Sequence, residues 1–188
     1  MRLRFILALA VITATAGTAF AAPVEETAKT CAACHGAAGA PIDPKIPVIW
    51  GQQAGYIYLD LKDFKSGARK NPLMSPMAAS LSKEDMMALA EYFSKKPWPN
   101  LAQKRASDAA TRIAELDANS GQCTQCHLGG YLGGGTTPRL ADQNRDYLVK
   151  TMQDFRSGAR ANNPWMTDLL KTYKNPDIQA LADYLAGL

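Results

Sequence analysis

Histidine and cysteine are scarce in this chain of 188 residues, which contains only two His and four Cys. Two His are too few for a His-rich metal site, and a strongly basic balance is also missing, since the formal net charge is +4. Such a small charge gives no reason to expect a nucleic-acid partner. The hydrophobic share of 47% excludes a disordered or collagen-like chain. The length allows one ordinary domain or two small ones.

Long hydrophobic runs are absent after residue 21, so we expect no segment of the roughly 20 apolar residues that a membrane-spanning helix needs. The one exception is at the N-terminus, where Arg2 and Arg4 precede an uncharged run over 5–20 that ends in the small-x-small pattern of 19–21. This pattern predicts a cleaved secretory signal peptide over residues 1–21 and a mature protein located in the periplasm. A second cleavage site at 14–16 and an uncleaved anchor are the alternatives.

Alternating strand patterns are missing as well, and the chain instead repeats itself. At offsets of 91 or 92 positions, residues 31–35 match 123–127, 63–69 match 154–160, 71–74 match 163–166, and 89–93 match 181–185. A repeat of this length indicates a tandem duplication of a domain of about 80 residues. We expect a first domain over 22–97, a linker over 98–104 that begins in a Pro-rich stretch, and a second domain over 105–188.

Helical patterns occur in both halves. Apolar residues recur at helical spacing at Met86, Leu89, Ala90 and Phe93, and again at Ile178, Leu181, Ala182 and Leu185. Ser82 with Asp85 predicts a capping box, and Asn175 before Pro176 predicts a helix start with Asn175 as the N-cap. Middle helices are expected over 53–65 and 144–156, ending at Gly67 and Gly158. A further helix is expected over 101–116 in the second half, whereas the corresponding helix of the first half, over 24–30, is expected to be short. The predicted fold class is all-α.

Every Cys and both His lie in two copies of one pentapeptide, Cys-x-x-Cys-His. The copies are Cys31, Cys34 and His35, and Cys123, Cys126 and His127. A structural disulfide does not need the adjacent His, a thioredoxin-like pair needs a βαβ context, and a zinc site would have to join distant pairs. The pentapeptide is the attachment signature of c-type haem. We therefore predict two covalently bound haem c groups, with His35 and His127 as iron ligands.

The second axial ligand of each iron must come from another residue type, because no His remains. Only Met74 and Met166 match between the halves, each 39 positions after its His in a loop segment. Met77 is a competitor in the first half. Met86 and Met152 lie on apolar helix faces and are expected in the core, and Met87 in the core or on the surface. Ligation by His and Met raises the reduction potential.

With these pentapeptides, the Met74 and Met166 segments and the C-terminal helices in view, the chain resembles cytochrome c4. That family consists of periplasmic di-haem proteins built from two class I cytochrome c domains. Leu81, seven residues after Met74, fits the family pattern, whereas Tyr173 departs from it at the matching position. The short helix over 24–30 departs too, which leaves open how the terminal helices of that domain pack.

The resemblance implies that the haems face each other across a pseudo-two-fold interface. It also implies that the carbonyls of Pro47 and Pro138 accept hydrogen bonds from His35 and His127. The repeated Arg69 and Arg160 are either partners of haem propionates or solvated surface charges. The repeated Tyr56 and Tyr147 are either packing residues or propionate donors.

The predicted function is electron transfer by a monomer, not enzymatic catalysis, because a six-coordinate site leaves no position for a small-molecule substrate. The expected partners are redox proteins, such as a terminal oxidase or a membrane quinol-oxidising complex, and membrane association is left open. A di-haem peroxidase would need a vacant iron site or additional His. A di-haem subunit of a flavocytochrome sulfide dehydrogenase type of enzyme remains an alternative, as does a disulfide-linked module without haem.

Overall fold

The computed structural model describes residues 23–188, so the predicted signal peptide of residues 1–21 lies outside the described part of the chain. Within this part the chain is helical and has no β-strand, only one isolated β-bridge between Gly134 and Thr137. The all-α prediction is confirmed. No helix in 23–188 is both long and apolar enough to cross a membrane.

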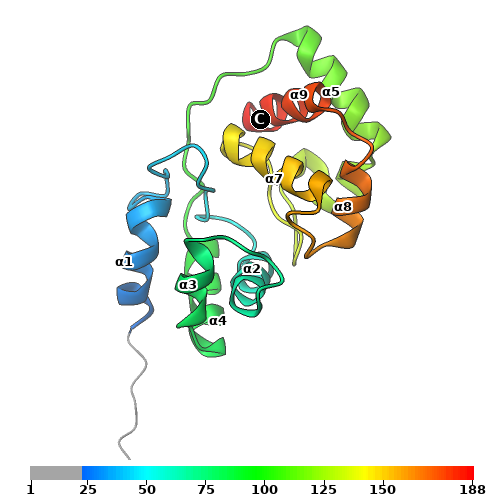
Figure 1. The fold of residues 1–188 in the computed structure, drawn as a ribbon. Helices are drawn as coiled ribbons and strands as arrows, with labels where there is room; N and C mark the ends of the chain where they lie inside the picture. The colour runs from blue at the N-terminus through cyan, green and yellow to red at the C-terminus, as the bar shows by residue number, and fades with distance from the viewer. Residues whose placement is uncertain (1–22) are drawn as a thin grey trace, which may run out of the picture.

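The helices form two groups that follow one another along the chain (Figure 1). The first group contains α1 (Val24–His35), α2 (Ala54–Ser66), α3 (Met74–Ala79) and α4 (Lys83–Ser94). The second contains α5 (Asp108–Ser120), α6 (Cys123–His127), the 3-10 turn η1 (Gly129–Tyr131), α7 (Arg145–Ser157), α8 (Pro164–Leu170) and α9 (Asn175–Ala186). Each group therefore has the same order of elements: a helix with Cys and His, a middle helix, a short helix with Met and a C-terminal helix.

The N-terminal helices differ between the groups. Helix α1 runs without a break through the pentapeptide at 31–35, whereas in the second half Gln122, in the left-handed region at φ 52°, separates α5 from α6. The expectation of a helix over 101–116 is wrong at both ends. Helix α5 begins at Asp108 because the Ser107 side chain caps it by accepting from the backbone N–H of Ala110, and it continues to Ser120.

Despite its short stretch before Cys31, α1 packs against the C-terminal helix of its group, as α5 does against α9. Ala28 of α1 belongs to the same buried cluster as Leu89 and Phe93 of α4. The packing that the sequence left open is therefore present in the first half.

The middle helices begin and end one residue later than expected, at Ala54–Ser66 and Arg145–Ser157. The glycines that follow them, Gly67 and Gly158, have φ of 80° and 77°, a left-handed conformation that glycine adopts at little cost. The predicted capping box of Ser82 and Asp85 is present. The expected N-cap at Asn175 is wrong by one position, since Lys174 precedes the helix and its N–H donates to Asp177.

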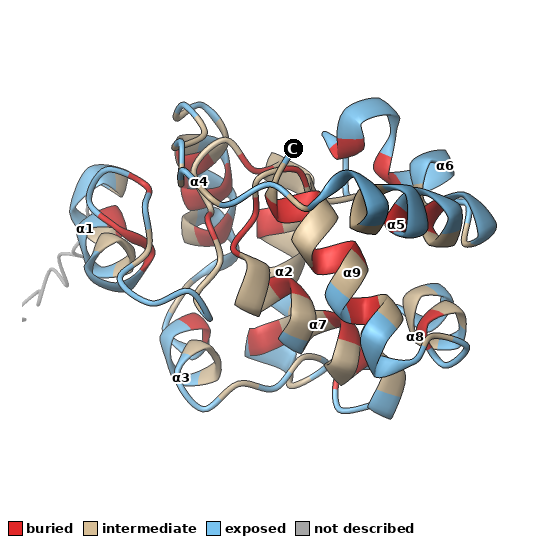
Figure 2. Ribbon diagram, turned by 90° about the horizontal axis from the view of Figure 1, so that it is seen from above, coloured by how far each residue is buried: buried red, intermediate tan, exposed pale blue. Residues whose placement is uncertain are grey.

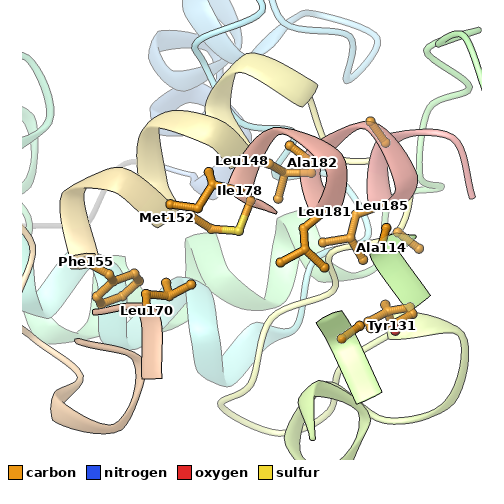
Figure 3. Packing of buried hydrophobic residues seen from close by; sticks show 13 residues of the cluster. Ala114, Tyr131, Leu148, Met152, Phe155, Leu170, Ile178, Leu181, Ala182 and Leu185 are labelled. Carbon is orange, nitrogen blue, oxygen red and sulfur yellow. The ribbon is translucent and has the colours of Figure 1, made fainter. Parts of the chain in front are cut away.

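The hydrophobic core of the second half is the larger one. Figure 3 shows Leu148 and Met152 of α7 with Ile178 and Leu181 of α9 in one buried cluster. Helices α3 and α8 lie at the periphery of the molecule, where most residues are exposed or half-buried (Figure 2). These two short helices carry the methionines that the repeat singled out.

An extended segment joins the two groups, from the end of α4 to the start of α5 (Figure 1). It is held against the second half by side chains. The indole N–H of Trp98 donates to the carbonyl of Asp142 at 3.3 Å, and the amide of Gln103 donates to the carbonyls of Gln143 and Ala186 at 3.0 and 3.3 Å.

Candidate haem sites

The pentapeptides place two thiols and one imidazole on a single helix turn in each half. In α1, Cys31, Cys34 and His35 are related by helical spacings of three and four residues, which bring side chains to one face. Cys31 is half-buried against the core and Cys34 is exposed. Cys123 and Cys126 repeat this difference in α6, and none of these four thiols is in a disulfide. In each pair, the first thiol therefore lies next to the hydrophobic core and the second lies at the surface.

Both histidines are buried and held by a backbone carbonyl. Nδ1 of His35 lies 2.8 Å from the carbonyl oxygen of Pro47, and Nδ1 of His127 lies 2.9 Å from that of Pro138. A carbonyl oxygen only accepts, so Nδ1 carries the proton in each ring and Nε2 keeps a free lone pair. Burial lowers the pKa of both rings, and the hydrogen bond to the proline carbonyl opposes this shift. The rings are thus held neutral, which is the form that ligates a metal.

Met74 and Met166 lie in short helices, not in loops as expected. Met74 is the first residue of α3, and Met166 lies in the first turn of α8. An asparagine orients each backbone: Asn71 accepts from the N–H of Met74 at 3.0 Å, and Asn163 accepts from the N–H of Met166 at 3.2 Å. The same asparagine–methionine hydrogen bond is therefore present in both halves, and in α8 it is also the N-cap bond of the helix. Both methionines are half-buried.

The other methionines are either buried in the core or exposed at the surface. Met86 and Met152 are 5% and 9% exposed and belong to the core, as predicted. Met87 lies on the surface, and Met77 of α3 is 42% exposed.

A buried cluster of charge lies where the two halves meet, centred on Asp60 of α2. The guanidinium groups of Arg69 and Arg160 both bond to its carboxylate, and they also donate to the hydroxyls of Tyr147 and Tyr56 at 3.2 and 3.4 Å. The alternative of solvated arginines is therefore wrong, since their side chains are only 13% and 7% exposed. Two buried guanidinium groups share one carboxylate, which leaves one positive charge in excess.

Burial raises the pKa of the Tyr56 hydroxyl strongly, with the nearby Asp60 carboxylate adding to the effect. Tyr56 therefore stays protonated. Its hydroxyl, which accepts from Arg160, keeps its own proton available for donation to a neighbouring acceptor.

The described residues fit haem in two respects besides the thiols and imidazoles. The indole N–H of Trp50 is buried and has no hydrogen-bond partner within 23–188, and a buried donor of this kind needs an acceptor. That donor and the excess positive charge around Asp60 suit the carboxylates of haem propionates. Apolar side chains next to the sites are exposed, as an apolar macrocycle would require. They are Ile42, Leu73, Leu128 and Leu132.

Two features of these sites could not be predicted from the sequence. Gln52 and Gln143 match in the repeat, but nothing in the pattern showed that each amide bonds to the opposite half. Tyr173, visible only as a departure from the family pattern, donates its hydroxyl to the carbonyl of Asp117 at 2.7 Å. The tyrosine hydroxyl thereby caps a carbonyl in the last turn of α5, next to Cys123.

Comparisons with known proteins place this geometry in a family. The family model described as "Cytochrome c" matches residues 24–96. A thiosulfate dehydrogenase electron acceptor of Stutzerimonas stutzeri is 37% identical, over 86% of this chain and 80% of that protein. Cytochrome c4 of Pseudomonas aeruginosa is 33% identical, over 89% of this chain and 88% of that protein.

Solved structures agree with the sequence relatives. The crystal structure of reduced recombinant cytochrome c4 from Pseudomonas stutzeri superposes with a TM-score of 0.77 at 31% identity, covering 89% of this chain and all of that one (100%). Cytochrome c4 from Acidithiobacillus ferrooxidans gives the same TM-score of 0.77 at 28% identity, covering 85% of this chain and 99% of that one. The chain belongs to the cytochrome c4 family, whose members are electron carriers with two covalently bound haem c groups.

Proposed function

We propose that this protein is a periplasmic electron carrier between components of a respiratory chain, with one haem domain over 22–97, a linker over 98–104 and a second haem domain over 105–188. Its haems are attached through Cys31 and Cys34 in the first half and through Cys123 and Cys126 in the second. His35 and Met74 would hold the iron of the first haem, and His127 and Met166 that of the second. Each haem, when bound, supplies a one-electron ferric/ferrous couple.

The observation that carries the proposal is the matched pair of histidine–proline hydrogen bonds. Because His35 and His127 each donate through Nδ1, each keeps Nε2 free for the iron, and the bond holds the ring in one orientation. The thioethers of Met74 and Met166 are weak donors to ferric iron, so this ligand pair favours a high potential. A histidine and a methionine would together hold each iron, which would leave no ligand position for a substrate.

The repeated asparagines support the methionine assignment. Asn71 and Asn163 hold the backbone N–H groups of Met74 and Met166 in the same way in both halves. Met77 has no counterpart of this kind in the second half and is partly exposed. These matched hydrogen bonds support Met74 and Met166 as the paired ligands.

The deciding experiment is to count covalent haems per chain in the periplasmic protein and to record the haem–Met charge-transfer band of the ferric form. We expect two haems, and we expect Met74→Ala and Met166→Ala each to remove about half of the band. Met77→Ala is the control and should leave the band at full strength. One haem per chain, a high-spin ferric wild type, or loss of the band in Met77→Ala would refute the assignment.

A specific redox partner is suggested by the relative named as an electron acceptor of thiosulfate dehydrogenase. If this chain serves the same purpose, a purified thiosulfate dehydrogenase with thiosulfate should reduce it much faster than thiosulfate alone. Reduction by ascorbate provides the reference for full reduction. Equal rates with and without the enzyme would exclude this partner and leave the respiratory carrier function in place.

A further inference from the structure

Two buried glutamines connect the halves in a reciprocal way. Oε1 of Gln143 accepts from the N–H of Val48 at 2.8 Å, and its Nε2 donates to the carbonyl of the same residue at 3.0 Å. Oε1 of Gln52 accepts from the N–H of Arg139 at 2.7 Å, and its Nε2 donates to that residue's carbonyl at 3.0 Å. Both glutamines are 3% exposed. Each half thus inserts one amide into the backbone of the other.

Two of these four bonds, those that the glutamine Oε1 atoms accept, come from the same peptide groups that hold the histidines. The N–H of Val48 belongs to the peptide whose carbonyl is that of Pro47, the acceptor of His35. The N–H of Arg139 belongs to the peptide whose carbonyl is that of Pro138, the acceptor of His127. One peptide unit therefore joins Gln143 of the second half to His35 of the first.

A peptide unit transmits polarisation from one end to the other. A strong acceptor on the N–H shifts electron density onto the carbonyl oxygen, and hydrogen bonds in such a chain strengthen one another. A more negative Pro47 oxygen binds the Nδ1 proton of His35 more tightly and makes Nε2 more basic. A more basic Nε2 stabilises ferric over ferrous iron, so the reduction potential of that site falls.

We propose that Gln52 and Gln143 are positioning residues that set the ligand strength of the histidine in the opposite half. Gln143 acts on His35 through the peptide of Pro47 and Val48. Gln52 acts on His127 through the peptide of Pro138 and Arg139. This inference rests on the proposed function, since it concerns the same axial histidines.

The arrangement makes both potentials depend on contact between the halves. The peptide N–H groups behind the two histidine acceptors, those of Val48 and Arg139, both donate to a glutamine of the opposite half. Other bonds also cross this boundary without touching either unit. The amide of Gln53, for example, donates to the carbonyl of Leu132 at 3.0 Å. Loss of that bond weakens the contact between the halves but leaves the hydrogen bonds from each glutamine through the peptide unit to the histidine intact. Gln53 therefore provides a matched control.

The test uses the di-haem protein and the variants Gln143→Met, Gln52→Met, Gln143→Glu and Gln53→Met. Methionine keeps the length of glutamine but offers no strong acceptor to the backbone N–H. A buried, protonated glutamate accepts and donates as glutamine does, so Gln143→Glu should restore the wild-type behaviour. The readouts are spectroelectrochemical titration of both haems and the Nδ1–H resonances of His35 and His127 in the reduced, diamagnetic protein.

We expect a crossed pattern. Gln143→Met should raise the potential of the first-half haem by about 28 mV, which is a threefold change in a one-electron equilibrium. It should also move the His35 Nδ1–H resonance upfield and leave that of His127 in place. Gln52→Met should raise the potential of the second-half haem in the same way, move the His127 Nδ1–H resonance upfield and leave that of His35 in place. This variant tests the same claim in the other half. Gln53→Met should change neither resonance.

An effect of Gln143→Met on His127, an equal effect on both rings, or a change no larger than that of Gln53→Met would overturn the inference. Those outcomes leave the two haems and their charge-transfer band intact, so the proposed function would stand. A wild-type protein with fewer than two covalent haems would overturn both, and it would be detected before any variant is measured.

Discussion

Asp60 of the first half accepts a hydrogen bond from the guanidinium of Arg160 of the second half at 3.2 Å. The same carboxylate pairs with Arg69, so one acid serves both arginines. The arginines are repeat partners, 91 positions apart, but the position 91 residues after Asp60 is Thr151. The repeat therefore supplies the two cations of the cluster, whereas its one anion, Asp60, occurs only in the first half.

Replacing this carboxylate should cost more than replacing an exposed one. Asp60→Asn leaves two buried guanidinium groups without their charged partner, and removing one member of a buried pair typically costs about 3 kcal/mol. We expect a loss of this size in the free energy of unfolding, measured on the holoprotein by guanidinium denaturation and circular dichroism.

The control for Asp60 is Asp168→Asn, which removes a surface pair with Lys171, since Asp168 is 74% exposed. Exposed pairs contribute little, so the expected loss is below about 0.5 kcal/mol. Equal losses in both variants would show that the Asp60 cluster is not buried in the holoprotein.

The indole N–H of Trp50 has no hydrogen-bond partner among residues 23–188, which leads to a prediction about the haem-loaded state. If this N–H donates to a propionate, Trp50→Phe should destabilise the holoprotein by about 2 kcal/mol, the usual contribution of a bond to a charged group. The indole proton should also exchange slowly with solvent in the holoprotein, which NMR measures directly.

Trp165→Phe is the matched control, because Trp165 is 87% exposed. Its substitution should change the free energy of unfolding by less than about 0.5 kcal/mol. A Trp50 indole proton that exchanges as fast as that of Trp165 would argue against the propionate bond.

Much of this molecule was predictable from the sequence because it is duplicated. The repeat drew attention to Met74 and Met166, and the helical spacing of Leu89 and Phe93 correctly predicted α4. Helix α2 ends before Gly67, as expected, because Gly67 adopts the left-handed conformation that terminates a helix. These features depend on local patterns that occur twice, so each copy supports the other.

The features that escaped prediction are contacts between distant parts of the chain. Gln143 and Val48 are 95 positions apart, and no local pattern shows that they pair. Asp60 and Tyr173 are single residues that depart from the repeat, so comparison of the halves gives no information on their partners. The start of α5 was misplaced because the Ala-rich stretch from residue 101 favours a helix, whereas the cap at Ser107 delays it.

The asparagine that caps α8 should control how firmly Met166 is held. Asn163→Ala removes the bond to the Met166 N–H, and loss of a helix cap costs about 1 kcal/mol. We expect the half of the charge-transfer band that belongs to the second haem to disappear at a lower temperature than in the wild type. Absorbance recorded during heating of the ferric protein measures this.

Ser107→Ala removes a cap of the same type from α5, which carries no methionine. It should cost similar stability without changing the band below the unfolding transition. Identical melting of the band in both variants would mean that Asn163 acts only on global stability.

Gly121 and Tyr173 lie side by side next to Cys123. A Cβ at Gly121 would lie 2.3 Å from the Tyr173 hydroxyl oxygen but 3.4 Å from the ring carbon that bears it. Because Gly121 has φ of −80°, alanine fits its backbone, and the hydroxyl is the main obstacle. Gly121→Ala alone should therefore destabilise the protein by about 2 kcal/mol, as overpacking of a filled site does.

Tyr173→Phe alone should cost about 1 kcal/mol, since it loses the bond to the Asp117 carbonyl, which still accepts from the N–H of Gly121 at 3.0 Å. In that background the obstacle is gone, and Gly121→Ala should stabilise by about 0.5 kcal/mol because it restricts the unfolded chain. The sign of the alanine effect thus reverses with the tyrosine. A double-mutant cycle of unfolding free energies measures the reversal, and additive effects would show that the two residues do not touch.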